Sequence, residues 1–411
     1  MIFAISVVPL LYLTGMGVDY SSAALREAQM NAIADAASLA AVTPAMMLQT
    51  DSASITQAQN AFNSQASAVS GVTYNSANLS VTVADTVTTR TVTVTYTAAS
   101  QNFFPNVLGQ TTIALKGTSQ AIGAVAPNIN FYLLLDNSPS MAIAATQAGI
   151  NTMVSNTSTQ GGCAFACHES HPSTDNLGNP SGEDNYQLAR NLGVTLRIDN
   201  LVTAVENLTT TAQTTETENN AHYQMAVYTF NTTFNTVGAM TNSMSTVSSD
   251  ASGITVEEVY SNNYLTSSND NNDEDTNYDA AMSGINAIMP NPGNGTNVSG
   301  DTPQEVLFIV TDGVEDEDVS GSRQQSLMST TECTTIKNRG IRIAVLYTTY
   351  YPLPTNSWYE TYIASFQPNI GTQLQSCASP GLYYEVSTGG DISAALSALF
   401  QAAVATAHLS E

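Results

Sequence analysis

The stretch FYLLLDNSPSM, residues 131–141, decides the fold. Its apolar part, 131–135, is typical of a strand buried inside a sheet, and Asp136, Ser138 and Ser140 follow it. In open α/β sheets, ligands bind at the carboxyl ends of the strands. Three oxygen-bearing side chains on one short loop at such an edge indicate a cation-binding site.

Strands and helical patterns alternate over the rest of the chain from residue 130 onward. Further strands are expected at 222–230, 305–312, 341–349 and 382–387, and helices from Ser140 and over 197–213, 277–289, 322–338, 357–366 and 391–407. This alternation predicts an α/β fold with a doubly wound, mainly parallel sheet flanked by helices. Two polar insertions, near 158–195 and 238–275, interrupt the pattern.

The motif DNSPSM fits the pattern Asp-x-Ser-x-Ser, and here the sequence resembles the von Willebrand factor A family, whose metal-ion-dependent adhesion site is built on that loop. The family also uses a threonine just before a helix and an aspartate at a strand end. Thr276 in DTNYDAAM and Asp312 in FIVTDGVED match these positions. The resemblance implies that Asp136 and Asp312 act mainly through bound waters or hydrogen bonds.

The predicted metal-binding residues suit a hard divalent cation. Mg²⁺ takes about six oxygen ligands in near-octahedral geometry and gives up its waters reluctantly. We expect Mg²⁺ (or Mn²⁺ or Ca²⁺), with the hydroxyls as neutral ligands and one position left for a carboxylate of a partner. The predicted set is Asp136, Ser138, Ser140, Thr276 and Asp312. The alternative is that Asp136 and the serines only cap a helix that begins near Ser140, because Asp and Ser are preferred at that position.

The N-terminal segment is apolar. Residues 1–18 contain no charged residue and would extend about 27 Å as a helix, close to the thickness of a bilayer core. An Ala-rich pattern continues the helix as far as Pro44, so we predict a transmembrane or pilin-like helix over 1–45, with a signal peptide as the alternative. The lack of a basic flank indicates an unusual start or residues that precede Met1.

A small α+β module is expected over 46–127. It comprises a helix at 51–68, a hairpin at 77–97 in which Val and Thr alternate, and a third strand within 111–125. Pro127 and Asn128 mark its end, so the large α/β domain is expected over 128–411.

The charge balance excludes nucleic acid as a partner. The 411 residues contain 34 Asp and Glu against nine Lys and Arg, a net charge of −25 that would repel phosphate backbones. Acidic runs at 269–276 and 312–321 are either solvated loops or a second calcium site, although neither has the spacing of an EF-hand. No GxSxG, HExxH or phosphate-loop motif is present in the sequence, and we predict a protein that is not an enzyme.

Four cysteines indicate two disulfides in an exported chain. Their order favours the pairs Cys163–Cys167 and Cys333–Cys377, although three pairings are possible. The segment CAFACH invites two other interpretations, a c-type haem attachment or a metal site that adds His168 and His171. The remaining two histidines, His222 and His408, are expected to be structural or exposed.

The ordered series of motifs extends the resemblance over nearly the whole chain. GVDYSSAALREAQMNAIADAASLAAV, a β-rich module, GGCAFACH, GVTLRID, VLFIVTDGVED and CASPGLYYEVSTGGDISAALSALF are together similar to the TadG-like proteins of tight-adherence (Flp-type) pilus assembly. The resemblance implies a membrane-inserted minor pilin or pilus-assembly subunit, with TadE-like and TadF-like proteins as neighbours. It places the A domain outside the bacterial inner membrane or at the pilus tip.

Three hypotheses of function follow. The leading one is a non-enzymatic adhesion and assembly protein that binds an acidic group of a partner through its cation. The second is an A-domain subunit of a metal-dependent exported complex that recruits a client protein. In the third, the protein is a surface protein whose metal site is vestigial.

Overall fold

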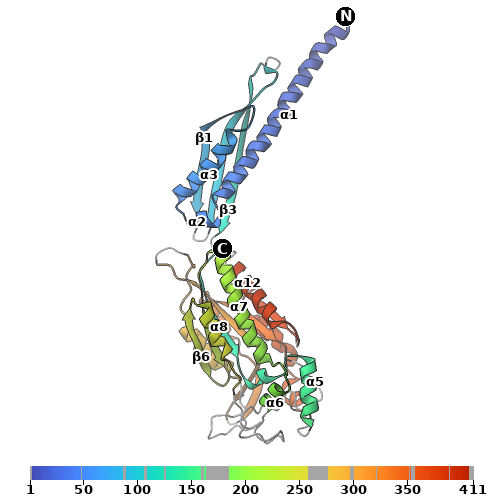
Figure 1. The fold of residues 1–411 in the computed structure, drawn as a ribbon, viewed down its shortest axis with the longest axis vertical. Coiled ribbons are helices and arrows are strands. Elements are labelled where there is room, and N and C mark those ends of the chain that lie inside the picture. Colours follow the sequence, from blue (N-terminus) through green and yellow to red (C-terminus); the bar gives the residue numbers. More distant parts are fainter. Residues whose placement is uncertain are drawn as a thin grey trace. The chain divides into compact units, whose positions relative to one another are not determined.

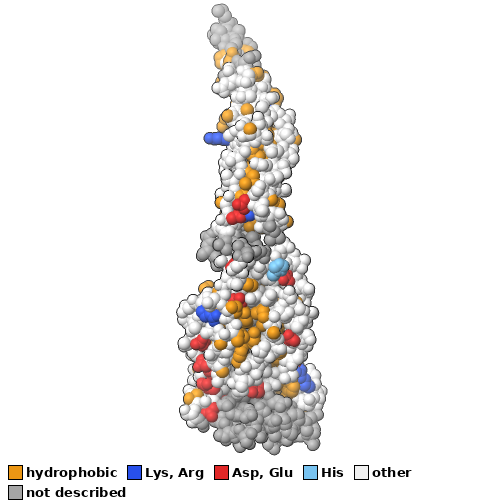
Figure 2. Space-filling view, turned by 90° about the vertical axis from the view of Figure 1, so that its left-hand side faces the viewer, with side chains coloured by type: hydrophobic (Ala, Val, Ile, Leu, Met, Phe, Trp, Pro, Cys, Tyr) orange, Lys and Arg blue, Asp and Glu red, His pale blue; other side chains and the backbone are white. Residues whose placement is uncertain are grey.

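The computed structural model divides into two compact units, Met1–Ala126 and Pro127–Glu411 (Figure 1). It describes residues 2–406 except for 48, 87–88, 106–108, 125, 159–161, 163–184, 258–275, 297–299, 321, 351, 353–356 and 388. On the face drawn in Figure 2, charged side chains are sparse among uncharged ones, in keeping with a chain of which only 10% is charged.

The first unit packs helices against one face of a three-stranded antiparallel sheet. Its helices are α1 (Ile2–Ala40), α2 (Pro44–Met47) and α3 (Asp51–Ala66), and its strands are β1 (Val72–Asp85), β2 (Thr89–Gln101) and β3 (Thr112–Ala124), in the order β1-β2-β3. Val92, Val94 and Tyr96 alternate along β2 with residues that are only partly buried. Together with Met30 and Phe62 these three side chains form the core of the unit.

Buried charges fasten this unit internally. Asp19 of α1 is buried, and its carboxylate accepts hydrogen bonds from the backbone N–H groups of Phe103 and Phe104. Arg26, about two turns further along α1, donates to Ser100 Oγ and to the carbonyl oxygen of Gln101. These contacts tie α1 to the end of β2 and to the loop that follows it.

The membrane span predicted within 1–45 is not found. Among the residues that the structure describes, no helix is both long enough and apolar enough to cross a bilayer. The helix itself is present, but its charge-free part ends at Val18, and the part beyond Asp19 packs on β3 and α3.

The second unit contains the predicted doubly wound sheet. Its six strands lie in the order β11-β10-β7-β4-β5-β6, and all pairs are parallel except β5 with β6. The strands are β4 (Ile129–Asp136), β5 (Tyr223–Phe230), β6 (Phe234–Thr241), β7 (Gln304–Thr311), β10 (Arg342–Thr348) and β11 (Tyr383–Val386). This order, read from β6 to β11, is the 3-2-1-4-5-6 order of doubly wound folds.

Helices cover both faces of this sheet. The helices α7 (Arg197–Asn219), α8 (Met244–Ser252) and α12 (Ile392–Thr406) pack together, as do α9 (Tyr278–Ile288) and α10 (Thr331–Asn338) (Figure 1). Phe131 of β4 contacts Phe400 of α12, whereas Tyr132 and Leu134 join the cluster formed with α9, α10 and α11 (Ile370–Cys377). Alternate residues of β4 therefore face opposite helix layers, which is why this strand is apolar throughout.

Shorter elements complete the unit. They are the single turn η1 (Pro139–Ala142), α5 (Gln147–Asn156), α6 (Asn185–Asn191), the hairpin of β8 (Val314–Asp318) and β9 (Arg323–Leu327), the π-helical turn η3 (Tyr359–Ile363) and η4 (Gln367–Asn369). The insertion predicted at 238–275 is partly regular structure, since it contains the end of β6 and all of α8.

A disulfide joins Cys333 of α10 to Cys377 of α11, with the two Cα atoms 5.2 Å apart. Both cysteines are buried in the helix layer against the sheet. The predicted partner bridge, Cys163–Cys167, lies outside the described residues, as do His168, His171 and His408. His222 is described and its side chain is 77% exposed.

Candidate metal-binding site

The candidate site lies where the strand order of the sheet reverses. From β4 the chain continues to β5 on one side, and β7 pairs with β4 on the other side. Such a switch point, at the carboxyl ends of the strands, is where doubly wound folds bind ligands. Asp136 is the last residue of β4 and Asp312 follows the last residue of β7, so two carboxylates reach this edge from adjacent strands.

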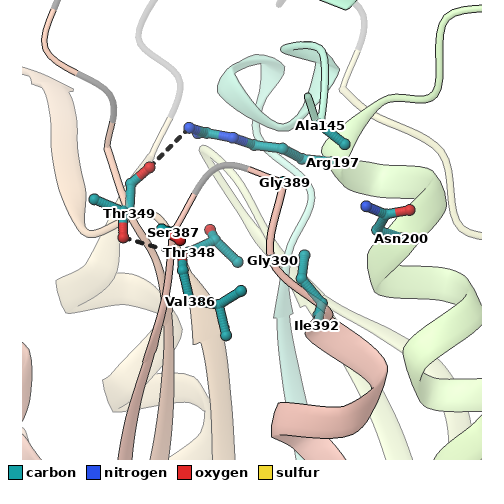
Figure 3. Close-up of a pocket in the computed structure, with 10 residues that line it drawn as sticks. All are labelled: Ala145, Arg197, Asn200, Thr348, Thr349, Val386, Ser387, Gly389, Gly390 and Ile392. Atoms are coloured by element: carbon teal, nitrogen blue, oxygen red, sulfur yellow. Dashed lines mark hydrogen bonds between the residues drawn. The ribbon is translucent and has the colours of Figure 1, made fainter. Parts of the chain in front are cut away.

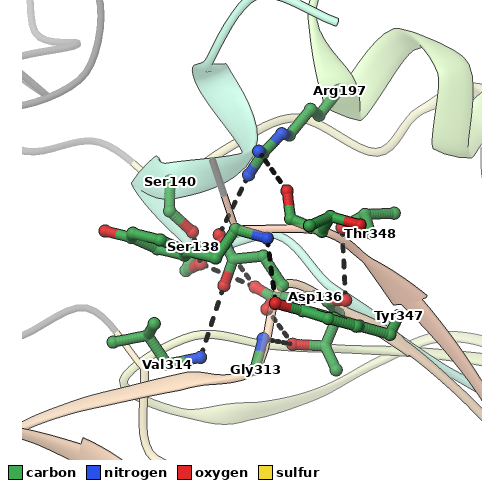
Figure 4. Close-up of polar contacts among 12 residues, drawn as sticks. Asp136, Ser138, Ser140, Arg197, Gly313, Val314, Tyr347 and Thr348 are labelled. Carbon is green, nitrogen blue, oxygen red and sulfur yellow. Dashed lines mark hydrogen bonds and ion pairs between the residues drawn. The ribbon is translucent and has the colours of Figure 1, made fainter. Parts of the chain in front are cut away.

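Asp136 is buried and held by three hydrogen bonds (Figure 4). Its Oδ1 accepts from the backbone N–H of Ser138 at 3.0 Å and from the Ser138 hydroxyl at 2.6 Å. Its Oδ2 accepts from the Thr311 hydroxyl at 2.6 Å. The hydroxyls of Ser138 and Ser140 lie 2.9 Å apart, which links both serines to this carboxylate.

The capping interpretation of this loop is wrong. The element after Ser138 is the single turn η1, and Ser138 makes no side-chain cap hydrogen bond to it. The Ser138 hydroxyl points instead to Asp136 and Ser140. The loop therefore gathers oxygen atoms at the edge of the sheet.

Asp312 is buried beside Arg197, the first residue of α7. Arg197 Nη1 lies 3.3 Å from Asp312 Oδ2, and Arg197 Nη2 donates to the carbonyl oxygen of Thr349 at 2.9 Å. Gly313, which follows Asp312 in the chain, has a φ of 83°. A Cβ atom at this position would lie 2.4 Å from Ile370 and 2.8 Å from Leu374. Only glycine therefore lets the chain turn between Asp312 and the packed helix α11.

The two carboxylates disfavour each other's charge. Burial, and next the nearby Asp312 carboxylate, raise the pKa of Asp136 to about 7, although hydrogen bonds from Ser138 and Thr311 oppose the shift. Burial also raises the pKa of Asp312, and the Arg197 guanidinium opposes that rise. Because a divalent cation would favour the ionised form of both groups, the charges fit such an ion.

Thr276 reaches the same end of the sheet through its backbone. Its N–H donates to the Asp316 carbonyl oxygen and its own carbonyl oxygen accepts from the Asp316 N–H, both at 2.9 Å. The next N–H, that of Asn277, donates to Asn231, just beyond β5. The contacts thus join four predicted residues, Asp136, Ser138, Ser140 and Asp312, through side chains, and Thr276 adjoins them through the hairpin.

Sequence reasoning missed three residues of this site. The Thr311 hydroxyl donates to Asp136 Oδ2, and it also forms a hydrogen bond with the Tyr278 hydroxyl. Burial, and next the Asp136 charge, raise the pKa of Tyr278, so that its hydroxyl stays protonated. Thr311 stands beside Asp312 in the motif VTDG, and Arg197 stands in the motif GVTLRID, but their contacts join residues far apart in sequence.

Arg197 also lines a small cavity (Figure 3). Its volume of about 10 Å³ suits roughly one water molecule. Its walls come from the ends of β10 and β11, the Gly389–Gly390 turn and the starts of α7 and α12. This space is too small for an organic ligand.

The second calcium site finds no support in the described residues. Within the ranges described above, no group of three or more His, Cys, Asp or Glu side chains is arranged to hold a metal ion. Most of the acidic run 269–276 lies outside those ranges. The run 312–321 is not a solvated loop throughout, because Glu315 and Asp316 belong to β8 and are buried.

Comparisons with known proteins give a family for the N-terminal segment. Residues 1–46 match the family model described as putative Flp pilus-assembly TadE/G-like, which confirms the TadG-like resemblance over this segment. No curated protein matches the sequence.

Three similar solved structures are all distant from this chain. The conserved hypothetical protein BatB from Bacteroides thetaiotaomicron is 12% identical over 68% of this chain and 100% of its own, with a TM-score of 0.37. The vWF domain of the type V pili tip protein Mfa5 from Porphyromonas gingivalis is 9% identical over 70% and 97%, also at 0.37. Proximal thread matrix protein 1 from the mussel byssus, with a zinc-occupied MIDAS motif, is 12% identical over 69% and 46%, at 0.32.

Proposed function

We propose that this chain is a non-enzymatic, pilus-associated adhesion or assembly protein that binds a partner through a divalent cation. The match of residues 1–46 to the TadE/G-like family supports the pilus association. The proposed setting is the bacterial cell envelope, with the second unit outside the inner membrane or at the pilus tip. TadE-like and TadF-like subunits are the proposed neighbours.

One observation carries the cation proposal. The Ser138 hydroxyl is buried, does not cap a helix, and lies between the Asp136 carboxylate and the Ser140 hydroxyl. Hydroxyl and carboxylate oxygens are the ligand types that Mg²⁺, Mn²⁺ and Ca²⁺ take. We assign Ser138, Ser140 and Thr276 as hydroxyl ligands, and Asp136 and Asp312 as carboxylates that act through waters or hydrogen bonds.

The surrounding residues orient these groups. Thr311 and the Ser138 N–H fix the two oxygens of Asp136, and Arg197 holds Asp312 from behind. The neutral hydroxyls leave most of the positive charge of a bound cation available to a carboxylate of the partner. The proposed partner group is therefore acidic, on a protein or on a surface ligand.

Thermal unfolding of the full-length chain tests this proposal. In EDTA and then in millimolar Mg²⁺, Mn²⁺ or Ca²⁺, the wild type is expected to gain about 2.7 kcal/mol of unfolding free energy at a cation concentration of about 100 Kd. Asp136→Ala is expected to lose this gain, whereas Asp250→Ala, an aspartate of α8, keeps it. Equal gains in the Asp136 variant and the wild type would remove the basis of the proposal.

A further inference from the structure

The hairpin of β8 and β9 follows Asp312 and Gly313 directly and forms its own two-stranded sheet. Its five cross-strand pairs run from Val314 with Leu327 to Asp318 with Arg323. The hairpin contacts two of the predicted site residues. The Val314 N–H donates to Asp312 Oδ1 at 3.5 Å, and Asp316 forms the reciprocal pair of backbone hydrogen bonds with Thr276. The location of Thr276 therefore depends on the location of Asp316.

Arg323 and Gln325 hold the side chain of Asp316 in place. Arg323 Nε donates to both carboxylate oxygens, at 2.8 and 3.1 Å, and Gln325 Nε2 donates to Oδ2 at 2.6 Å. The side chains of Arg323 and Asp316 are only 8% and 7% exposed. A forked arginine contact of this kind fixes direction as well as distance.

Arg323 and Gln325 also contact Trp358, the single tryptophan of the chain. The Arg323 guanidinium lies 5.0 Å from the centre of the Trp358 ring, and Trp358 Nε1 donates to Gln325 Oε1 at 3.0 Å. Tyr362, on the π-helical turn η3, stacks on Trp358 with ring centres 4.2 Å apart. Two side chains of the hairpin are thus held by the same aromatic residue.

We propose that Asp316 and Arg323 are positioning residues of the metal site, which hold Thr276 where its hydroxyl completes the set of ligands. This inference rests on the proposed function. Asp136 and Asp312 are fixed by paired strands of the large sheet, whereas Thr276 is fixed by the hairpin and its neighbour Asn277 by Asn231. Loss of the contacts of Asp316 with Arg323 and Gln325 should therefore weaken cation binding without removing any ligand. Supporting residues of this kind change metal affinity by about 10–100-fold.

A Mg²⁺ titration of the full-length chain, followed by thermal unfolding, tests the inference. Arg323→Ala is expected to raise the Mg²⁺ concentration for half-maximal stabilisation at least about tenfold. Arg323→Lys is expected to restore only part of the loss, because an ammonium group cannot reproduce the fork. The matched control is Arg339→Ala, which removes an arginine bound to Asn286 and Met289 at the far end of α9 and should leave that concentration unchanged.

A second variant and a second signal distinguish weaker Mg²⁺ binding from misfolding of the variant protein. Asp316→Asn keeps the shape of the side chain and is expected to raise the same Mg²⁺ concentration, while the midpoint in EDTA shows whether the variant is folded. Mg²⁺ is also expected to change the Trp358 emission of the wild type, through Arg323 and Gln325, and to change it less in Asp316→Asn.

The outcomes separate the two proposals. A wild type that responds to none of Mg²⁺, Mn²⁺ and Ca²⁺ overturns the proposed function and this inference with it. A wild type that responds, together with folded Arg323→Ala and Asp316→Asn proteins that bind Mg²⁺ at the wild-type concentration, overturns only the positioning role.

Discussion

In the unit of residues 1–126 a buried arginine is surrounded by acceptors, whereas in the unit of residues 127–411 two aspartates are buried near each other and Arg197 contacts Asp312. Arg90 donates to Asp51, Asp85 and Ser54 and to two backbone carbonyl oxygens. The hydrogen bond from Arg90 holds the pKa of Asp85 below its usual value, while burial and Asp312 raise that of Asp136 to about 7. The pKa values of the two aspartates thus shift in opposite directions, because Arg90 donates directly to the partly exposed Asp85, whereas Asp136 is fully buried near a second carboxylate.

The difference separates a structural cluster from the proposed cation-binding one. The Arg90 cluster is complete within the chain and needs no further group. The Asp136 cluster has acceptor oxygens in excess, which a cation would neutralise. The variants below either disrupt one cluster and leave the other intact, or test whether the same contrast in stability and cation binding holds at other residues.

The largest effect is expected at Arg90. Arg90→Ala leaves the carbonyl oxygens of Met46 and Gln49 and the Asp85 carboxylate without their donor. Because each acceptor that loses its donor costs about 1–3 kcal/mol, the change should destabilise the first unit by about 3–5 kcal/mol. Hydrogen exchange of the full-length chain, followed over residues 72–124, measures the loss. Lys116→Ala, on an exposed position of β3, is the control and should change stability by less than about 0.5 kcal/mol. Unchanged protection in the Arg90 variant would show that the cluster is not structural.

Gly313→Ala should have the next largest effect. The added methyl group meets Ile370 and Leu374 in a backbone conformation with φ of 83°, and the strain and overpacking together cost roughly 2–4 kcal/mol. Gly381→Ala has a similar φ of 75° in open space, so it should cost only about 1–2 kcal/mol. Denaturant unfolding compares the two variants. Equal losses would mean that contact with α11 does not constrain the turn after Asp312.

Glu305 tests whether a raised carboxyl pKa by itself marks a cation site. Glu305 is the second residue of β7, at the end opposite to Asp312, and burial raises the pKa of its carboxyl from 4.5 to about 7. A carboxyl with a raised folded-state pKa contributes stability at low pH, and that contribution is lost as the pH rises from about 4.5 to about 7. The free energy of unfolding of Glu305→Gln, relative to that of the wild type, should therefore rise by up to about 3 kcal/mol across this range.

Unfolding of Glu305→Gln and wild type between pH 4.5 and pH 8 measures this gap. Mg²⁺ should not alter it, since Asn130, Tyr132 and Arg339 are the groups that act on Glu305. A gap that closes when Mg²⁺ is added would place a cation at Glu305 and contradict the contrast with Asp136.

The smallest effects are expected at two helix caps. Thr50 caps α3 in the first unit and Asn277 caps α9 beside Thr276, through hydrogen bonds of 3.3 and 2.8 Å. Each substitution by Ala should cost about 1 kcal/mol. Only Asn277→Ala should also raise the Mg²⁺ concentration needed for stabilisation, because it loosens the residue next to Thr276. An equal shift in Thr50→Ala would show that the titration reports general stability.

The sequence predicts the sheet well because its strands are long apolar runs with helical patterns between them. The strand 131–135 and the runs at 305–312 and 341–349 leave little choice of structure. The position of Asp136 and its serines follows from the end of the first strand. Packing between distant segments is not visible in this way. The sequence of α8 looks like part of a polar insertion because its buried face is short.

Contacts across long stretches of chain account for what was missed at the site. Arg197 and Asp312 are 115 positions apart, so no local pattern joins them. The acidic run 312–321 resembled a solvated loop because its charges are dense, but Asp316 is paired with Arg323 seven residues later. Charge pairing of this kind needs the hairpin, which the polar composition of the segment conceals.

Direct counting of bound Mn²⁺ tests the central claim most directly. Electron paramagnetic resonance of free Mn²⁺, titrated into the full-length chain, should show one tightly bound ion per chain in the wild type. The same titration should show none in Asp136→Ala and one in Asp250→Ala. An Asp136→Ala protein that binds Mn²⁺ as the wild type does, or a folded wild type that binds none, would contradict the account.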